Sequence, residues 1–239
     1  MKLQRREIPF ENLMTKTQTA LGWIYLFVHV ALLPVLLGLL QTVSPSPMDE
    51  PTLNLVYYLV GIVFCLTAAF TFLRRGFDRL ADNLRACILT LFMALLLDYV
   101  LSGVAALLLM FVDSAVENPN NALVMEMAQD SGVIRAVAIF LAPIVEEVLF
   151  RGALFGSIRT RSRAWAYVAS VAAFSLYHVW QYAALYGDWK MLFYALQYIP
   201  ISIVLAWAYE RSSCIWTSIF FHMGFNALSL YALELVDKL

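Results

Sequence analysis

Charged residues are scarce in this sequence: Lys, Arg, Asp and Glu make up 14% of its 239 residues, against 62% hydrophobic residues. The mean hydropathy is +0.75, and a soluble domain usually has about a quarter of its residues charged. This composition therefore excludes a soluble globular protein. The net charge is −1, so no whole-molecule attraction to nucleic acid is expected.

Cysteine is also rare, with three residues in the chain, and no two of them form a Cys-x-x-Cys pair. This scarcity excludes a disulfide framework and a cysteine-based zinc site. We expect the three thiols to serve as small packing groups, as most free cysteines do.

Long apolar stretches are abundant instead, and seven of them are long enough to cross about 30 Å of hydrocarbon as helices. The sequence thus predicts an all-α, polytopic transmembrane helical bundle with seven to eight spans, forming one integral-membrane domain over residues 1–239. The expected spans are 19–40, 53–73, 86–112, 133–158, 164–186, 191–209 and 214–236.

The basic residues alternate between successive loops, which predicts the orientation of the bundle under the positive-inside rule. The intervening loops are acidic, with Asp49 and Glu50, then Asp113 and Glu117, and then Asp188. We therefore expect a cytoplasmic N-terminus, with the first span kept as an anchor and not removed as a signal peptide. The residues on the expected cytoplasmic side are Lys2, Arg5, Arg6, Lys16, Arg74, Arg75, Arg79, Arg85, Arg159, Arg161, Arg163 and Arg211.

Three short polar patterns lie within the fourth, fifth and seventh expected spans. Ionisable and amide side chains are costly in hydrocarbon, and they usually mark a functional site. Counted from the nearest cytoplasmic arginine at 1.5 Å per residue, Glu146, His178, His222 and Asn226 lie about 17 to 23 Å deep. These four side chains can therefore meet at one level of the bundle. The patterns are Glu146-Glu147 with Arg151, Phe174 with His178, and His222 with Asn226.

The spacing of these residues predicts their chemistry. Glu147 and Arg151 are four positions apart and share a helix face, so Glu147 is the expected partner of Arg151, which leaves Glu146 free to act as a base. Glu146 and His178 can deprotonate a water molecule directly. Alternatively, Glu146, His178 and His222 can hold Zn²⁺, which activates the water.

His222 and Asn226 complete this hypothesis. Either side chain can donate a hydrogen bond to the oxyanion of a tetrahedral intermediate. Phe174 is expected to wall the site against lipid. Pro143 interrupts the fourth span and predicts two helical pieces, 133–142 and 143–158, which places Glu146 near the start of the second piece.

The three patterns together resemble the E-E-x-x-x-R, F-x-x-x-H and H-x-x-x-N motifs of the CAAX-processing and bacteriocin-processing (CPBP, or Abi) intramembrane proteases. The resemblance covers about residues 133–230, the expected protease core, and leaves 1–112 as accessory spans. It implies cleavage of membrane-associated or lipid-tethered peptides or proteins. It also implies Glu146 as the water-activating base, with His178, His222 and Asn226 around the oxyanion, and a multi-pass protein of a bacterial cell membrane.

Two other functions agree with the same residues. Midplane carboxylates and a proline-interrupted helix are also typical of ion-coupled transporters, and a non-catalytic immunity or scaffold protein would need no chemistry at all. Asp98 lies at the depth of the motifs and has no assigned partner, whereas His29 is expected to be structural.

Overall fold

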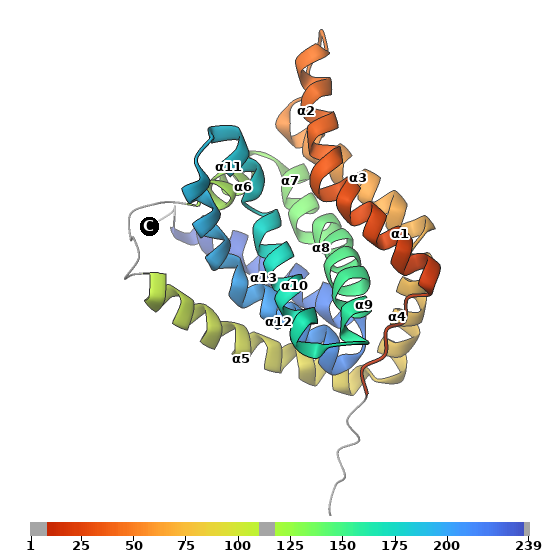
Figure 1. Cartoon of the computed structure of the whole chain (residues 1–239). Coiled ribbons are helices and arrows are strands. Elements are labelled where there is room, and N and C mark those ends of the chain that lie inside the picture. Colours follow the sequence, from red (N-terminus) through yellow and green to blue (C-terminus); the bar gives the residue numbers. More distant parts are fainter. Residues whose placement is uncertain (1–8, 110–117, 237–239) are drawn as a thin grey trace, which may run out of the picture.

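The computed structural model describes residues 9–109 and 118–236, and every regular element in these residues is helical (Figure 1). Up to residue 155 the elements are α1 (Lys16–Phe27), η1 (Val28–Leu32), α2 (Leu33–Val43), α3 (Glu50–Thr67), α4 (Phe70–Asp82), α5 (Leu84–Leu109), α6 (Pro119–Asp130), α7 (Gly132–Ala136), η2 (Val137–Leu141), α8 (Ala142–Glu146) and η3 (Glu147–Phe155). The elements that follow are α9 (Gly156–Arg159), α10 (Arg163–Tyr177), α11 (Trp180–Tyr186), η4 (Trp189–Tyr198), α12 (Ile199–Ser212) and α13 (Ile215–Val236).

Four helical stretches in the described part of the chain are long and apolar enough to cross a membrane. The all-α membrane fold is therefore confirmed, while the total of seven to eight spans stays a prediction. These stretches are Lys16–Val43, Glu50–Thr67, Leu84–Leu108 and Trp189–Ser212.

The expected fourth span does not break at Pro143, and the expectation of two separate helical pieces is wrong. The backbone keeps right-handed helical angles at Leu141 and at the flanking caps, so helix runs on from α7 to α9. The π-helical segment η2 precedes the proline, and its wider turn pairs the N–H of Ala142 with the carbonyl of Val137. Because the turn is wide, the pyrrolidine ring is accommodated without a kink that separates two pieces.

The expected fifth span, in contrast, is interrupted. Helix α10 ends at Tyr177, and α11 begins at Trp180 after a turn that contains His178. The carbonyl groups near this helix end are free to accept side-chain hydrogen bonds. The imidazole of His178 therefore has backbone acceptors within reach.

Polar side chains define several helix starts. Thr15 and Gln18 form a capping box at the start of α1, and Asp49 accepts from the N–H of Thr52 at the start of α3. Each such cap satisfies a backbone donor that the helix itself leaves unpaired. Ser131, Ser162 and Asp188 cap α7, α10 and η4 in the same way.

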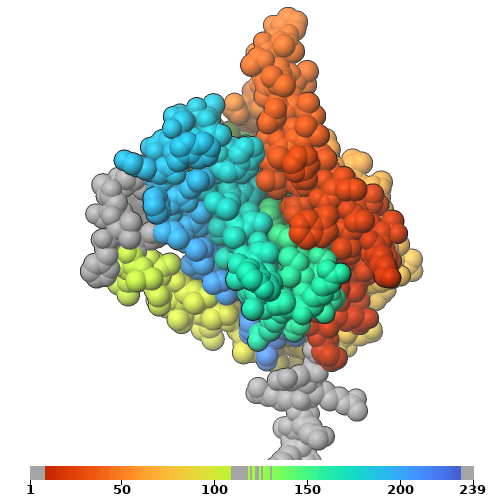
Figure 2. All heavy atoms as spheres, in the orientation of Figure 1, coloured from red at the N-terminus to blue at the C-terminus, as the bar shows by residue number. Residues whose placement is uncertain are grey.

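The segment η3 forms the centre of the bundle, and all nine of its residues are buried. Helices α1, α10, α12 and α13 pack around it. At the periphery, α2 has no buried residue and projects beyond the rest of the molecule (Figures 1 and 2). The motif-bearing helix run is thus enclosed by both halves of the chain.

Basic side chains gather at one end of the bundle. Arg79 in α4 pairs with Glu11 at 2.6 Å, and Glu210 near the end of α12 binds Arg159 and Arg163. The start of α3, with Asp49 and Glu50, lies at the other end (Figure 1). This separation agrees with the expected orientation, although several residues used to derive it lie outside the described chain, namely Lys2, Arg5, Arg6, Asp113 and Glu117.

Candidate active site

Glu146, His178 and His222 converge in the interior of the bundle, as the sequence predicted. The Oε2 atom of Glu146 lies 3.8 Å from Nε2 of His222 and 4.0 Å from Nε2 of His178. Glu146 and His222 are buried, at 3% and 4% exposure, while the side chain of His178 is 16% exposed. Three separate segments, α8, the turn after α10, and α13, thus direct polar atoms toward one point.

The second nitrogen of each histidine is held by a group that can only accept a hydrogen bond. Nδ1 of His178 lies 2.9 Å from the carbonyl oxygen of Phe174, and Nδ1 of His222 lies 3.0 Å from Oε1 of Glu147. A carbonyl and an ionised carboxylate have no proton to give, so both Nδ1 atoms must carry the hydrogen. In the neutral rings the Nε2 lone pairs therefore face Glu146.

Glu147 forms the predicted ion pair with Arg151, which confirms that assignment. Nη1 of Arg151 donates to Oε1 of Glu147 at 2.9 Å, and neither side chain has any exposed surface. Ser218 donates to the other carboxylate oxygen, and Nη2 of Arg151 donates to Ser202. These bonds satisfy most of the remaining polar atoms, as a buried pair requires, and Nε of Arg151 is left without a hydrogen-bond partner among the described residues.

Phe174 packs against the other two motifs. Its ring lies 4.1 Å from the guanidinium carbon of Arg151, and its centroid is 4.6 Å from that of His178 and 5.8 Å from that of His222. His178 also stacks on Tyr198, with centroids 4.3 Å apart. The expected role of Phe174 as a packing residue is therefore confirmed, and the imidazole of His178 contacts the rings of both Phe174 and Tyr198.

Asn226 lies on α13, one turn beyond His222, and it bonds to the backbone of the helix run that carries Glu146. Its Nδ2 atom donates to the carbonyl of Ala138 at 2.8 Å. A π-helix such as η2 pairs each carbonyl with the N–H five residues later, so the partner of the Ala138 carbonyl would be the N–H of residue 143. Residue 143 is a proline, which has no N–H. Asn226 supplies the missing donor, and its second N–H is left for another acceptor.

The charges of this buried cluster do not balance with neutral histidines. If both histidines are neutral, the cluster contains two negative carboxylates, Glu146 and Glu147, and one positive guanidinium, that of Arg151. Uncompensated charge is expensive in a low-dielectric interior, so one more proton is favoured within the cluster. Glu146 and the two Nε2 atoms are the positions that can hold it.

The spacing of these side chains does not fit the zinc alternative. Among the residues that the structure describes, no group of three His, Cys, Asp or Glu side chains is placed to hold a metal ion. Zinc at about 2.0–2.1 Å from tetrahedral ligands would need ligand atoms about 3.3 Å apart, which is shorter than the 3.8 and 4.0 Å seen around Glu146. A water molecule hydrogen-bonded both to Oε2 of Glu146 and to a histidine Nε2 is compatible with these distances.

Sequence reasoning missed several residues that build the site. Ser218 could have been found, since it precedes His222 by four positions on the same helix face. Ser202 and Tyr198 carry no such signal. Neither does Tyr58 in α3, whose hydroxyl donates to Oε1 of Glu146 at 2.8 Å.

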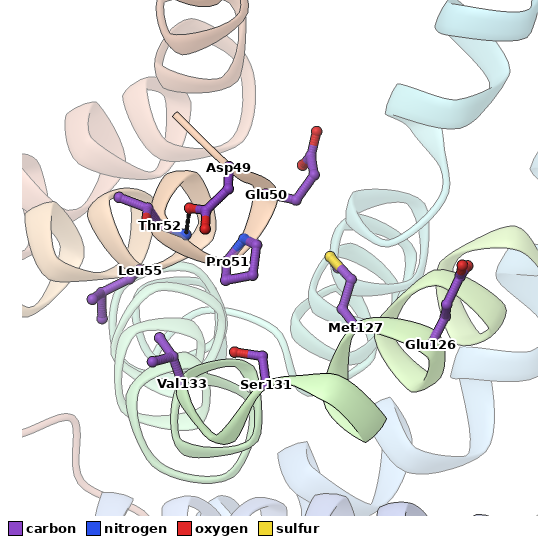
Figure 3. Close-up of a pocket in the computed structure, with 9 residues that line it drawn as sticks. All are labelled: Asp49, Glu50, Pro51, Thr52, Leu55, Glu126, Met127, Ser131 and Val133. Atoms are coloured by element: carbon purple, nitrogen blue, oxygen red, sulfur yellow. Dashed lines mark hydrogen bonds between the residues drawn. The ribbon is translucent and has the colours of Figure 1, made fainter. Parts of the chain in front are cut away.

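Two other features lie apart from this centre. A cavity of about 610 Å³ opens beside the start of α3, and its lining includes Asp49, Glu50 and Glu126 but no motif residue (Figure 3). Asp98 is buried in α5, where its Oδ1 atom has no hydrogen-bond partner within the described chain. The structure gives neither feature a role in the centre around Glu146.

Comparisons with known proteins point to a protease family for the segment that carries the motifs. Residues 129–228, which include all three motifs, match the family described as type II CAAX prenyl endopeptidase Rce1-like. A curated relative, UPF0177 protein YbdI of Lactococcus lactis subsp. lactis, is 26% identical over 140 residues, or 56% of this chain and 70% of the relative. No solved structure matches the chain. The resemblance to CPBP proteases that the motifs predicted is thereby confirmed: residues 129–228 are similar to the Rce1-like type II CAAX prenyl endopeptidases.

Proposed function

We propose that this membrane protein is an intramembrane endopeptidase that hydrolyses peptide bonds of membrane-associated or lipid-tethered peptides or proteins. One observation carries the proposal. A buried carboxylate oxygen of Glu146 faces the Nε2 atoms of His178 and His222. The Nδ1 proton of each ring is already donated to another acceptor, a backbone carbonyl for His178 and the carboxylate of Glu147 for His222. This arrangement provides acceptors for the protons of a single water molecule, as activation of a hydrolytic water requires.

In the proposed reaction, a water molecule lies between Glu146 and His178. Its oxygen attacks the scissile carbonyl carbon while one of its protons moves to Oε2 of Glu146. The carbonyl π electrons move to the oxygen, which becomes the oxyanion. When the C–N bond breaks, the proton on Glu146 passes to the leaving amine, so the carboxylate is restored.

The oxyanion needs hydrogen-bond donors. His222 is the first proposed donor: in its doubly protonated form Nε2 donates to the oxyanion while the carboxylate of Glu147 accepts from Nδ1. The free N–H of Asn226 is the second proposed donor. A single donor of this kind typically contributes about 3 kcal/mol to the stability of the transition state.

The substrate class follows from the location of the site. A peptide bond can reach a centre among membrane-spanning helices most readily when the peptide is already held at the bilayer. The matching family is named for prenyl endopeptidases, which favours a lipid-tethered substrate. The Lactococcus relative supports a bacterial origin, and the apolar helices support placement in the cell membrane.

The proposal can be tested with the purified protein in liposomes and fluorogenic peptides with and without a prenyl group. We expect cleavage by the unmodified protein and a loss of kcat of at least about 100-fold in Glu146→Gln and His178→Ala. Arg161→Ala, an exposed change at the turn between α9 and α10, should leave cleavage unchanged.

Undiminished cleavage by both site variants would reject the assignment. Uptake of a solute driven by an ion gradient, with no cleavage of any peptide, would favour a transporter. Cell protection from a toxin that is undiminished by Glu146→Gln would favour a non-catalytic immunity protein.

A further inference from the structure

We infer that Tyr58, in the N-terminal half of the chain, is a positioning residue for Glu146, and that a chain of three tyrosine hydroxyls holds it in place. The inference rests on the proposed function. It concerns α3 (Glu50–Thr67), which lies outside the segment that matches the protease family.

The contact with Glu146 is direct and leaves the reacting side of the carboxylate free. The hydroxyl of Tyr58 donates to Oε1 at 2.8 Å, while Oε2 faces the two histidines. A hydrogen bond on Oε1 fixes the rotation of the carboxylate about its last side-chain bond. Oε2 is then directed at the position that the attacking water would occupy.

Tyr58 is itself held by neighbouring hydroxyls. Its oxygen lies 3.2 Å from the hydroxyl of Tyr177, which lies 3.1 Å from that of Tyr57. Tyr57 donates at 2.8 Å to the backbone carbonyl of His29. The chain of hydroxyls therefore runs from the carboxylate of Glu146 to the backbone of η1.

Because each hydroxyl has a single hydrogen, the donor in each of these hydrogen bonds can be assigned. A hydroxyl donates one hydrogen, so Tyr58 is committed to Glu146 and Tyr57 to the carbonyl of His29. Tyr177 retains a single proton to give to either neighbour. The dependence of Glu146 on the three hydroxyls should therefore decrease from Tyr58 to Tyr177 and then to Tyr57.

A glycine allows α3 to come close enough for this contact. Gly61 is three positions after Tyr58 and therefore on the same helix face. A Cβ atom there would lie 2.7 Å from both methyl carbons of Val145, the residue before Glu146. Only a residue without a side chain lets α3 pack against α8 at this distance.

The test compares kcat and KM of Tyr58→Phe, Tyr177→Phe and Tyr57→Phe in liposomes, with the peptide substrate used for the unmodified protein. We expect Tyr58→Phe to lower kcat by about 10- to 100-fold, as for loss of a hydrogen bond to a charged group, with little change in KM. Tyr177→Phe should have a smaller effect, and Tyr57→Phe a smaller one still. Thermal unfolding of each variant separates this pattern from a general loss of structure.

Gly61→Ala provides a second route to the same contact. It keeps the tyrosine but displaces α3, so kcat should fall, and adding Tyr58→Phe should lower it little further. Gly103→Ala, where a Cβ would meet no atom within 4 Å, is the matched control and should behave like the unmodified protein.

The outcomes distinguish the role of Tyr58 from the proposed function. If Glu146→Gln is inactive but Tyr58→Phe retains full kcat, the role of Tyr58 is rejected while the protease assignment stands. If Tyr58→Phe changes KM alone, or if the three tyrosine variants lose activity equally, positioning is also rejected. Full activity of Glu146→Gln would overturn both.

Discussion

Arg151 has no exposed surface, and it contacts residues from three separate helical segments. Its guanidinium donates to Glu147, donates to Ser202 in α12, and lies over the ring of Phe174. Glu147 in turn holds Nδ1 of His222. Arg151 therefore fixes the charge and position of the carboxylate that orients one of the two site histidines, without facing the water position itself.

Replacing Arg151 should be costly for stability. In Arg151→Met the carboxylate of Glu147 is left buried without its cation, which we expect to lower the free energy of unfolding by about 3–5 kcal/mol. Chemical denaturation in detergent micelles, followed by circular dichroism, would measure the change. Arg161→Ala serves as the control because Arg161 is exposed, and its unfolding free energy should stay within about 0.5 kcal/mol.

The double variant Glu147→Gln/Arg151→Met separates stability from activity. It removes both charges, so we expect most of the lost stability to return. The carboxylate that holds His222 is still missing, so cleavage should remain impaired. Recovery of activity together with stability would contradict the role of Glu147 in orienting His222.

The polar residues of the site could be predicted because polar side chains are rare in membrane spans and expensive there. The two histidines are among three in the whole chain. Tyr58 could not be recognised in this way, because the chain has 12 tyrosines and a tyrosine in a span is tolerated for its ring alone. Its role depends on how closely α3 packs on α8, which no local pattern encodes.

At the scale of the elements, the helix run from α7 to α9 shows where sequence reasoning about Pro143 failed. The missing N–H was treated as a helix break, because within one helix nothing can replace it. In the folded protein Asn226 of α13 donates to the carbonyl of Ala138 instead. A residue 88 positions from Ala138 in the sequence thus keeps the helix continuous.

This replacement of the missing donor predicts an energetic coupling between the two helices. Asn226→Ala should lower the free energy of unfolding by about 1–3 kcal/mol, the cost of a buried carbonyl left without a donor. In a Pro143→Ala background the backbone N–H of position 143 can donate, so the cost of Asn226→Ala should be much smaller. Denaturation of the four proteins in this cycle measures the difference.

The same cycle tests the proposed oxyanion contact. If the second N–H of Asn226 binds the oxyanion, kcat should fall in both backgrounds, whether or not stability is restored. For the stability measurement, an equal loss of unfolding free energy in both backgrounds would show that Asn226 does not replace the N–H that Pro143 lacks.

For the whole molecule, the distribution of charge indicates how the bundle lies in the bilayer. Ser213, between α12 and α13, bonds to Pro9 and Glu11, so the start of the described chain and the start of α13 lie together at the basic end. Lys and Arg favour the cytoplasmic side of a membrane. The end with Arg159 and Arg163 is therefore expected to face the cytoplasm, and the opposite end, with Asp188, the exterior.

Cysteine labelling can measure this orientation directly. The three native cysteines are buried, so single exposed cysteines introduced at Arg161 or Asp188 can be followed against a low background. With a membrane-impermeant maleimide on intact bacterial cells, we expect Asp188→Cys to be labelled and Arg161→Cys to react only after permeabilisation. The reverse pattern would place the basic end outside, in which case the local charges do not determine the topology. A substrate tethered to the cytoplasmic leaflet would then have to reach Glu146 from the acidic end of the bundle.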